Sequence, residues 1–186
     1  MHTEWCVCDE IPRLSLRTRL VVVMHKREQH KTTATAPLAL QALTSAELHL
    51  HGIPDAPLDL RPLHEEGRRV LVLFPSDDAV ELRPPDDGRD VTLVVPDGSW
   101  RQASKAVRRV PGLAEAQKVV LPPGPPTAWR LRREPREGGL ATLEAIARAV
   151  GVLESAEAQE RLEALFDRVV ERTLWTRQPS PNRRPD

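Results

Sequence analysis

The sequence predicts an α/β fold with a mostly parallel sheet flanked by helices on both faces. Several short runs are continuously apolar, which is typical of parallel strands that are buried on both faces. Segments whose apolar residues recur at helical spacing separate these runs. The chain has 186 residues, a length typical of one domain. A chain of this size buries about 70% of the surface that its unfolded form exposes.

The expected strands are apolar runs that end at polar residues or prolines. They lie at 20–24, 70–74, 91–95 and 119–121, and 47–51 is compatible with a further short strand. We expect helices at 36–44, 101–109, 143–150 and 156–175. The proline-rich segments 84–88 and 122–126 predict loops. Residues 178–186 are polar and aperiodic, so we expect a disordered tail after a single domain spanning 1–177.

Charge and composition exclude several classes of protein. The formal net charge is zero, so any nucleic-acid site must be a local patch rather than a property of the whole chain. The first residues are polar and no apolar run approaches the length of a membrane span, which predicts a cytoplasmic protein with no membrane segment. Cys6 and Cys8 with His2 offer three metal ligands where a structural zinc site uses four, so we expect no metal.

Polar clusters follow three of the expected strands. They are His25 with Arg27, Glu28 and Lys31; Ser76 with Asp77; and Asp97 with Ser99. The carboxyl ends of parallel strands share one edge of a sheet, and ligands of open α/β folds bind there. The alternative is that the Asp and Ser side chains only cap the helices that follow.

The segment Asp97-Gly98-Ser99-Trp100 lies between an expected strand and an expected helix. In one interpretation Asp97 or Ser99 caps the helix and Gly98 supplies an unusual backbone angle. In the other, Gly98 lets a ligand approach the backbone while Asp97 accepts a proton or a hydrogen bond. Trp100 either packs against a ligand or fills the core. The spacing alone does not decide between these interpretations.

Two basic segments are candidates for binding anions. Arg101, Lys105 and Arg108 share one face of the expected helix, which is either a solvated face or a surface for RNA phosphates. The stretch 130–136 is also rich in arginine and precedes Gly138-Gly139 and an expected helix N-terminus. This stretch is either a solvated loop with Thr142 as the helix cap or part of a site for an anionic ligand.

Five motifs in order resemble those of a known family. They are Cys6-x-Cys8-x-x-Ile11; His25-x-x-Glu28-x-x-Lys31-x-Thr33-x-Thr35; Phe74-Pro75-Ser76; Asp97-Gly98-Ser99-Trp100; and Leu131-Arg132 followed by Leu140-Ala141-Thr142-Leu143-Glu144-Ala145. This set resembles the DTW-domain family, whose members include tRNA-uridine aminocarboxypropyltransferases. The resemblance runs from about Cys6 to about Thr173, and the ordered set is specific although each motif alone is weak.

The resemblance implies a knotted α/β fold of the SPOUT-like type. It also implies S-adenosylmethionine as co-substrate and transfer of its 3-amino-3-carboxypropyl group to N3 of a uridine in tRNA, leaving methylthioadenosine. Uridine N3–H is weakly acidic, so a carboxylate such as Asp97 would take or orient this proton. The alternatives are aminocarboxypropyl or methyl transfer to rRNA or another acceptor, and a non-catalytic RNA-binding module on the same fold.

The strand-end clusters and the resemblance together give a set of expected site residues. The catalytic candidates are Asp97 and Glu144. The candidates for binding the co-substrate are Pro75, Ser76, Gly98, Ser99, Trp100, Leu140 and Thr142. The candidates for binding RNA are His25, Lys31, Arg101, Lys105, Arg132 and Arg133.

The chain departs from the family pattern at a few positions. Lys26 and Ala34 stand where the family has Pro and Asn, and Ser99 and Ala141 stand where it has Thr and Ser. The cysteines that the family carries further upstream are absent from this sequence. These departures bear on the substrate and on the metal more than on the fold.

Overall fold

A computed structural model of the chain describes residues 6–127 and 139–177. In these residues six strands form one sheet with the order β2-β1-β5-β3-β6-β4, and every pair of neighbours is parallel. The strands are β1 (Arg19–His25), β2 (Ala46–His51), β3 (Arg69–Leu73), β4 (Val80–Glu81), β5 (Val91–Asp97) and β6 (Gln117–Val120). The predicted fold class, a mostly parallel α/β sheet, is therefore confirmed.

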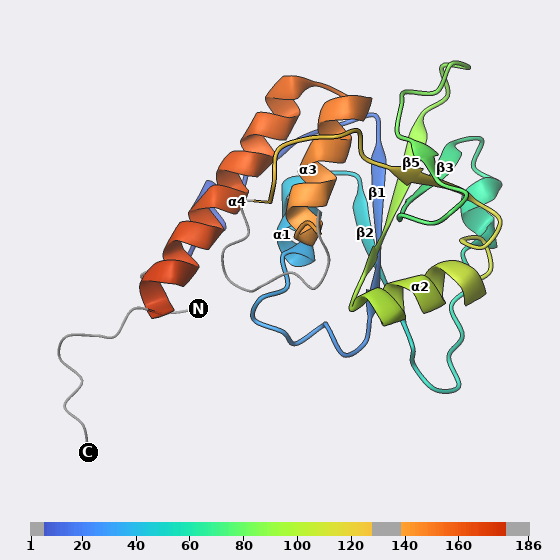
Figure 1. Cartoon of the computed structure of the whole chain (residues 1–186), viewed down its shortest axis with the longest axis horizontal. Coiled ribbons are helices and arrows are strands. Elements are labelled where there is room, and N and C mark those ends of the chain that lie inside the picture. Colours follow the sequence, from blue (N-terminus) through green and yellow to red (C-terminus); the bar gives the residue numbers. More distant parts are fainter. Residues whose placement is uncertain (1–5, 128–138, 178–186) are drawn as a thin grey trace.

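Helices cover both faces of this sheet, as Figure 1 shows. One face carries α1 (Ala36–Ala42), α3 (Thr142–Leu153) and α4 (Ala156–Arg177), and the other carries α2 (Trp100–Arg109) and the short 3-10 helix Arg61–His64. A second 3-10 helix lies near the N-terminus at Cys8–Glu10. The knot that the resemblance implies and the domain boundary after residue 177 stay predictions.

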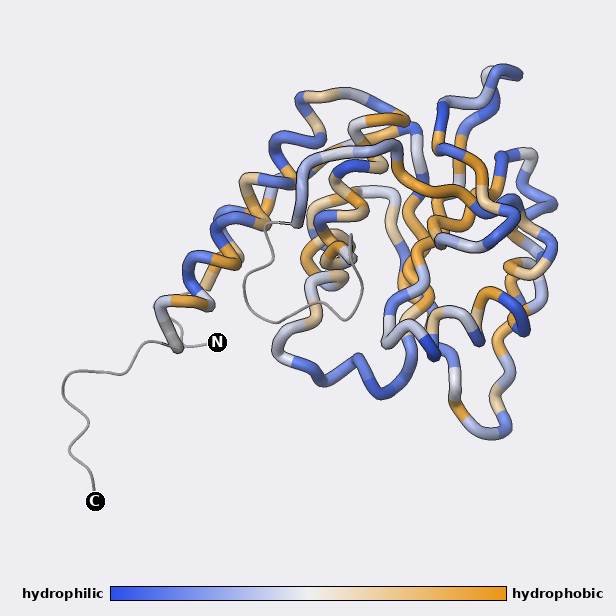
Figure 2. Tube along the Cα trace, in the orientation of Figure 1, coloured by the Kyte–Doolittle hydropathy of each residue, from blue (hydrophilic) through white to orange (hydrophobic). Residues whose placement is uncertain are grey.

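Strand β1 shows why the apolar runs are continuous. Leu20, Val22 and Met24 point into the core shared with α1, α3 and α4. Val21 and Val23 point into the core shared with α2. All five side chains are at most 1% exposed. Successive side chains of a strand point to opposite faces, so a strand covered on both sides must be apolar at every position. Figure 2 shows the resulting hydrophobic centre of the sheet, with the hydrophilic residues in the loops and along the outer helices.

Besides shifts of a few residues at the ends of strands and helices, the structure differs from the sequence-based expectations at two notable places. The helix expected at 36–44 ends at Ala42, because Leu43 is extended and forms a parallel bridge with Leu14. Strand β4 was not expected; it has two exposed residues, too few to show a periodic pattern, and is recognisable only by its pairing with β6.

Some expectations fall on residues that the structure does not describe. The tail at 178–186 and the expected RNA-binding residues Arg132 and Arg133 lie outside the described ranges. Within 6–127 and 139–177, no helix combines the length and the apolar character needed to cross a bilayer. The cytoplasmic location stays a prediction.

Candidate functional site

A cavity with a volume of about 1030 Å³ lies at the carboxyl edge of the sheet. Its walls come from the ends of β3, β5 and β6, the loop before α1, the segment 121–127 and the N-terminal end of α3. Loops beyond the carboxyl ends of parallel strands are where open α/β folds bind ligands. We call this space the main cavity.

Asp97 meets the first residue of α3 in the wall of the main cavity. Asp97 is the last residue of β5, and its Oδ1 accepts a hydrogen bond of 2.5 Å from the hydroxyl of Thr142. Both side chains are half-buried and both line the cavity. A carboxylate at the N-terminus of a helix is stabilised by the helix dipole. The fold therefore holds a negative charge at the edge of the cavity, at a position fixed by two elements 45 residues apart.

Ser99, and not Asp97, caps helix α2. The Gln102 N–H donates to Ser99 Oγ at 3.4 Å, and the Ser99 N–H donates to Gln102 Oε1 at 2.7 Å, which is a capping box. A Cβ at Gly98 would lie 3.1 Å from both Cβ and Oε1 of Gln102, so the glycine leaves room for this cap. Each interpretation of the motif thus applies to a different residue. Ser99 has the capping role, and Asp97 faces the cavity.

The N-terminal end of α3 is bound by a residue from the loop before α1. The hydroxyl of Thr35, which is 5% exposed, accepts a hydrogen bond of 3.1 Å from the Leu143 N–H. This N–H is one of the donors that have no partner within a helix. Thr35 stands at the start of α1 but makes no side-chain cap there. Its side chain instead joins the α1 loop to α3.

Glu144 lies behind the wall of the main cavity and is 3% exposed. Its carboxylate accepts hydrogen bonds from the Thr127 hydroxyl at 2.6 Å and from the Ala141 N–H at 3.4 Å. The other oxygen forms an ion pair of 3.0 Å with Arg148. Thr127, Ala141 and Arg148 all line the cavity, whereas Glu144 does not. These contacts suit a residue that holds the wall in place.

The main cavity also has a large apolar surface. The apolar lining residues include Leu73, Phe74, Trp100, Val119 and Leu121, followed by the proline-rich loop 122–126. Trp100 is half-buried, and its ring centroid lies 5.7 Å from that of Phe74 with the planes 57° apart. Trp100 is therefore part of the cavity wall and does not fill the core.

Most of the expected site residues line the main cavity. These are Lys31, Pro75, Asp97, Gly98, Ser99, Trp100, Arg101, Leu140 and Thr142. Lys31 Nζ bonds Glu28 Oε1 at 2.7 Å, and Glu28 lines the cavity as well. Lys105 is exposed on α2 outside the cavity. The roles of these residues stay predictions.

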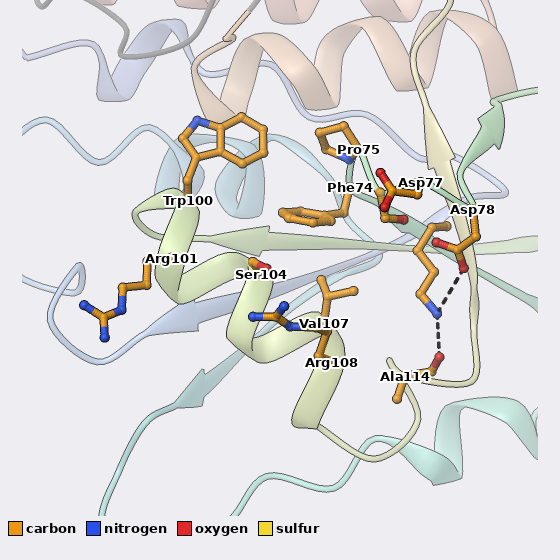
Figure 3. Close-up of a pocket in the computed structure, with 12 residues that line it drawn as sticks. Phe74, Pro75, Asp77, Asp78, Trp100, Arg101, Ser104, Val107, Arg108 and Ala114 are labelled. Atoms are coloured by element: carbon orange, nitrogen blue, oxygen red, sulfur yellow. Dashed lines mark hydrogen bonds and ion pairs between the residues drawn. The ribbon is translucent and has the colours of Figure 1, made fainter.

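A second cavity of about 970 Å³ lies between α2 and the loop after β3 (Figure 3). We call it the α2 cavity. It shares Phe74, Pro75, Trp100 and Arg101 with the main cavity. Ser76 lines this cavity and not the main one. The clusters after β1 and β5 therefore meet at the main cavity as expected, while Ser76 and Asp77 face its neighbour.

His25 lies beside the main cavity and supports the start of α2. Its Nδ1 accepts from the Arg27 N–H at 3.2 Å and lies 3.2 Å from Gln102 Nε2. The ring meets the ring of His51 edge-on, with centroids 5.0 Å apart. Burial, followed by the charge of Arg27, lowers the pKa of His25. The imidazole is therefore neutral at pH 7, and an RNA contact by this residue stays a prediction.

Sequence reasoning missed several residues that build the site. Gln102 links the α2 cap to His25, and the capping-box spacing of Ser99 and Gln102 was a usable signal. Arg148 lies four residues after Glu144, a spacing at which helical side chains meet. The contacts of Thr35 and Thr127 join distant segments and leave no local signal.

The described residues contain no group of three or more His, Cys, Asp or Glu side chains that could hold a metal ion. Cys6 and Cys8 are exposed free thiols. The absence of a metal stays a prediction, because this finding covers only the described residues and so leaves out His2.

The fold and the site define an α/β protein with a ligand cavity at the carboxyl edge of a parallel sheet, beside a helix with a basic surface. Comparison with known families identifies the family within this class. The DTW domain matches residues 1–174, and the chain belongs to the DTW-domain family. No solved structure matches the chain.

Two relatives carry the same printed name. The tRNA-uridine aminocarboxypropyltransferase 2 of Drosophila melanogaster is 29% identical over 157 residues, which are 81% of this chain and 62% of the relative. The tRNA-uridine aminocarboxypropyltransferase 2 of Macaca fascicularis is 24% identical over 158 residues, 80% of this chain and 53% of the relative. This chain thus spans less than two thirds of the length of either relative.

Proposed function

We propose that this protein transfers the 3-amino-3-carboxypropyl group of S-adenosylmethionine to N3 of a uridine in tRNA. Membership of the DTW-domain family and the names of the two relatives support this activity. The observation that carries the proposal is the carboxylate of Asp97, held by Thr142 at the edge of the main cavity.

The main cavity fits the chemistry of S-adenosylmethionine, which has a flat base, a positive sulfonium, an ammonium and a carboxylate. The apolar wall around Phe74 and Leu121 suits the base. The backbone segment 139–140 ahead of α3 lines the cavity and suits the carboxylate, because backbone N–H groups favour anions. A cavity of about 1030 Å³ leaves room for a uridine as well.

The residues of the chain supply positioning and a proton acceptor. When bound, S-adenosylmethionine supplies a carbon that its sulfonium already activates. Asp97 orients uridine N3–H and takes its proton while N3 bonds to that carbon and the carbon–sulfur bond breaks. Thr142 fixes the orientation of Asp97 through its 2.5 Å hydrogen bond. Thr35 and Glu144 hold the start of α3, and so hold Thr142 in register with β5. Such fixed geometry is itself a large part of catalysis.

The RNA would meet the basic surface of α2. Arg101, Lys105 and Arg108 are all exposed, as the sequence predicted, and the helix carries no acidic residue. No ion pair engages these three residues within the described part of the chain. Because the formal net charge is zero, this local surface is what would attract the phosphates.

The test is incubation of the purified protein with tRNA, and in a parallel reaction with rRNA, and S-adenosylmethionine labelled either in the aminocarboxypropyl group or in the methyl group. The proposal expects label in the tRNA only from the first donor, together with released methylthioadenosine. Label from the methyl group would show a methyltransferase, and label in rRNA alone would show a different acceptor. Binding of tRNA with no transfer from either donor would show an RNA-binding module.

A further inference from the structure

The α2 cavity has the composition of a nucleotide-binding site. The rings of Phe74 and Trp100 form one wall, with centroids 5.7 Å apart. Bases stack on aromatic side chains of this kind in single-stranded RNA complexes. A volume of about 970 Å³ is ample for one nucleotide.

The cationic residues from α2 and the acidic residues that line the α2 cavity lie on opposite sides of it. Arg101 and Arg108 come from α2, and Asp77 and Asp78 come from the loop after β3 on the opposite side (Figure 3). Lys118, the remaining cation of the lining, donates to the carbonyl of Ala114 and lies 4.0 Å from Asp78. In Figure 3 Arg101 points away from the aromatic wall, so Arg108 presents the donors for a phosphate, and the aspartates present acceptors for the amino group of a base.

We propose that the α2 cavity binds one nucleotide of the RNA next to the target uridine, with its phosphate on Arg108 and its base between the aromatic wall and the aspartates. Because Asp77 and Asp78 are acceptors, the cavity favours a base with an exocyclic amino group over uracil, whose only donor on the base is N3–H. This inference rests on the proposed function for the identity of the RNA, and goes beyond it by assigning a second binding site.

The location of the cavity favours an RNA nucleotide over a free one. The two cavities share Phe74, Pro75, Trp100 and Arg101, so a nucleotide in the α2 cavity is separated from the main cavity by the thickness of these side chains. The exposed row of Arg101, Lys105 and Arg108 continues along the same helix and follows a phosphate chain better than a single phosphate.

The first of two experiments compares Arg108→Ala with Arg109→Ala, and the nucleotide competition that follows separates the cavity from the exposed basic row of α2. Both arginines are exposed and both lie in the last turn of α2, but only Arg108 lines the cavity. The two variants lose the same charge at the same end of the helix. Fluorescence anisotropy with labelled tRNA should show about tenfold weaker binding for Arg108→Ala and less than about twofold weaker binding for Arg109→Ala. Equal losses would overturn the proposal, because bulk charge would then explain both.

A second measurement tests the base and the source of the nucleotide. AMP, CMP and GMP should compete with labelled tRNA for the wild-type protein more strongly than UMP does, and Asp77→Ala should lose this difference. Equal competition by all four would overturn the assignment of the aspartates. The assignment to RNA would be overturned by a different result: free nucleotides bind through Arg108, but Arg108→Ala and the wild-type protein bind tRNA equally well.

The labelling assay separates this proposal from the proposed function. Transfer of the aminocarboxypropyl group with equal effects of the two arginine variants would leave the function standing and remove the second site. A clear difference between the variants without any transfer would keep the nucleotide site and remove the transferase activity. Calorimetric titration with S-adenosylmethionine should give the same affinity for Arg108→Ala and wild type, because Arg108 does not line the main cavity.

Discussion

Helices α2 and α3 both begin at the carboxyl edge of the sheet and both border the main cavity, yet their N-terminal ends are held differently. The start of α2 is closed by Ser99 and Gln102, which are three residues apart. The start of α3 is held by Thr35, which is 108 residues from its partner, and by Thr142 binding Asp97 across 45 residues. A local cap stabilises one helix, whereas the distant contacts join three segments into one wall of the site.

This difference predicts where substitutions are most harmful. Changes at the start of α3 should affect the stability of the protein and the shape of the main cavity together. Changes at the start of α2 should affect mainly the helix itself. Four substitutions test the comparison, in order of the expected size of the effect.

Glu144→Ala should cause the largest loss of stability, about 3 kcal/mol, because it removes the ion pair with the half-buried Arg148 and the acceptor of the Ala141 N–H. Urea unfolding followed by circular dichroism measures the loss. In the double variant Glu144→Ala/Arg148→Met the loss should be smaller than the sum of the two single losses. A stable but inactive Glu144→Ala protein would contradict the structural role and favour the predicted catalytic one.

Asp97→Asn should lower the rate of transfer by about 100-fold or more, the usual contribution of a positioned acid–base group. The amide oxygen still accepts from Thr142, so the melting temperature and the affinity for S-adenosylmethionine should change little. Single-turnover transfer to tRNA and calorimetry give the two readings. A fully active variant would remove the catalytic assignment of Asp97 and leave the fold unaffected.

Thr35→Val should destabilise the protein by about 2 kcal/mol, because the buried N–H of Leu143 loses its acceptor while the shape of the side chain is kept. Thr32→Val is the matched control, since Thr32 lies in the same loop and is exposed. The control should stay within about 0.5 kcal/mol of wild type. Equal unfolding midpoints in urea for the two variants would show that the contact to α3 contributes nothing.

Ser99→Ala should cost about 1 kcal/mol, the usual effect of losing a helix cap. This loss of stability is smaller than the one expected for Thr35→Val, because the cap is local and Ser99 is exposed. Ser104→Ala in the middle of the same helix serves as control and should not lower stability, since alanine favours helix. A loss at Ser99 larger than that at Thr35 would reverse the comparison between the two helices.

The two helix starts also show what the sequence could predict. Ser99 and Gln102 are visible as a capping-box spacing, and the buried strands are visible as continuous apolar runs. The convergence of the clusters after β1 and β5 at the main cavity was predicted from the direction of parallel strands. These features depend on neighbours in the sequence or on a rule of topology.

The remaining features depend on contacts between distant residues. The sequence singled out Glu144 but not its bonds to Thr127 and Arg148, which place it behind the cavity wall. Ser76 was expected at the same site as Asp97, but the chain turns after Phe74 so that Ser76 faces the α2 cavity. No local sequence pattern indicates the direction of such a turn. The direction depends on the surface against which the segment after the strand packs.

Trp100 and Phe74 form a shared wall, one side chain thick, between the main cavity and the α2 cavity. A ligand on either side contacts the same pair of rings, so a shift of the rings toward one cavity is a shift away from the other. Thermodynamic linkage then requires that any change in RNA affinity caused by the donor be matched by an equal change in donor affinity caused by the RNA. The order in which the two ligands arrive would alter the kinetics of assembly but not the free energy of the ternary complex.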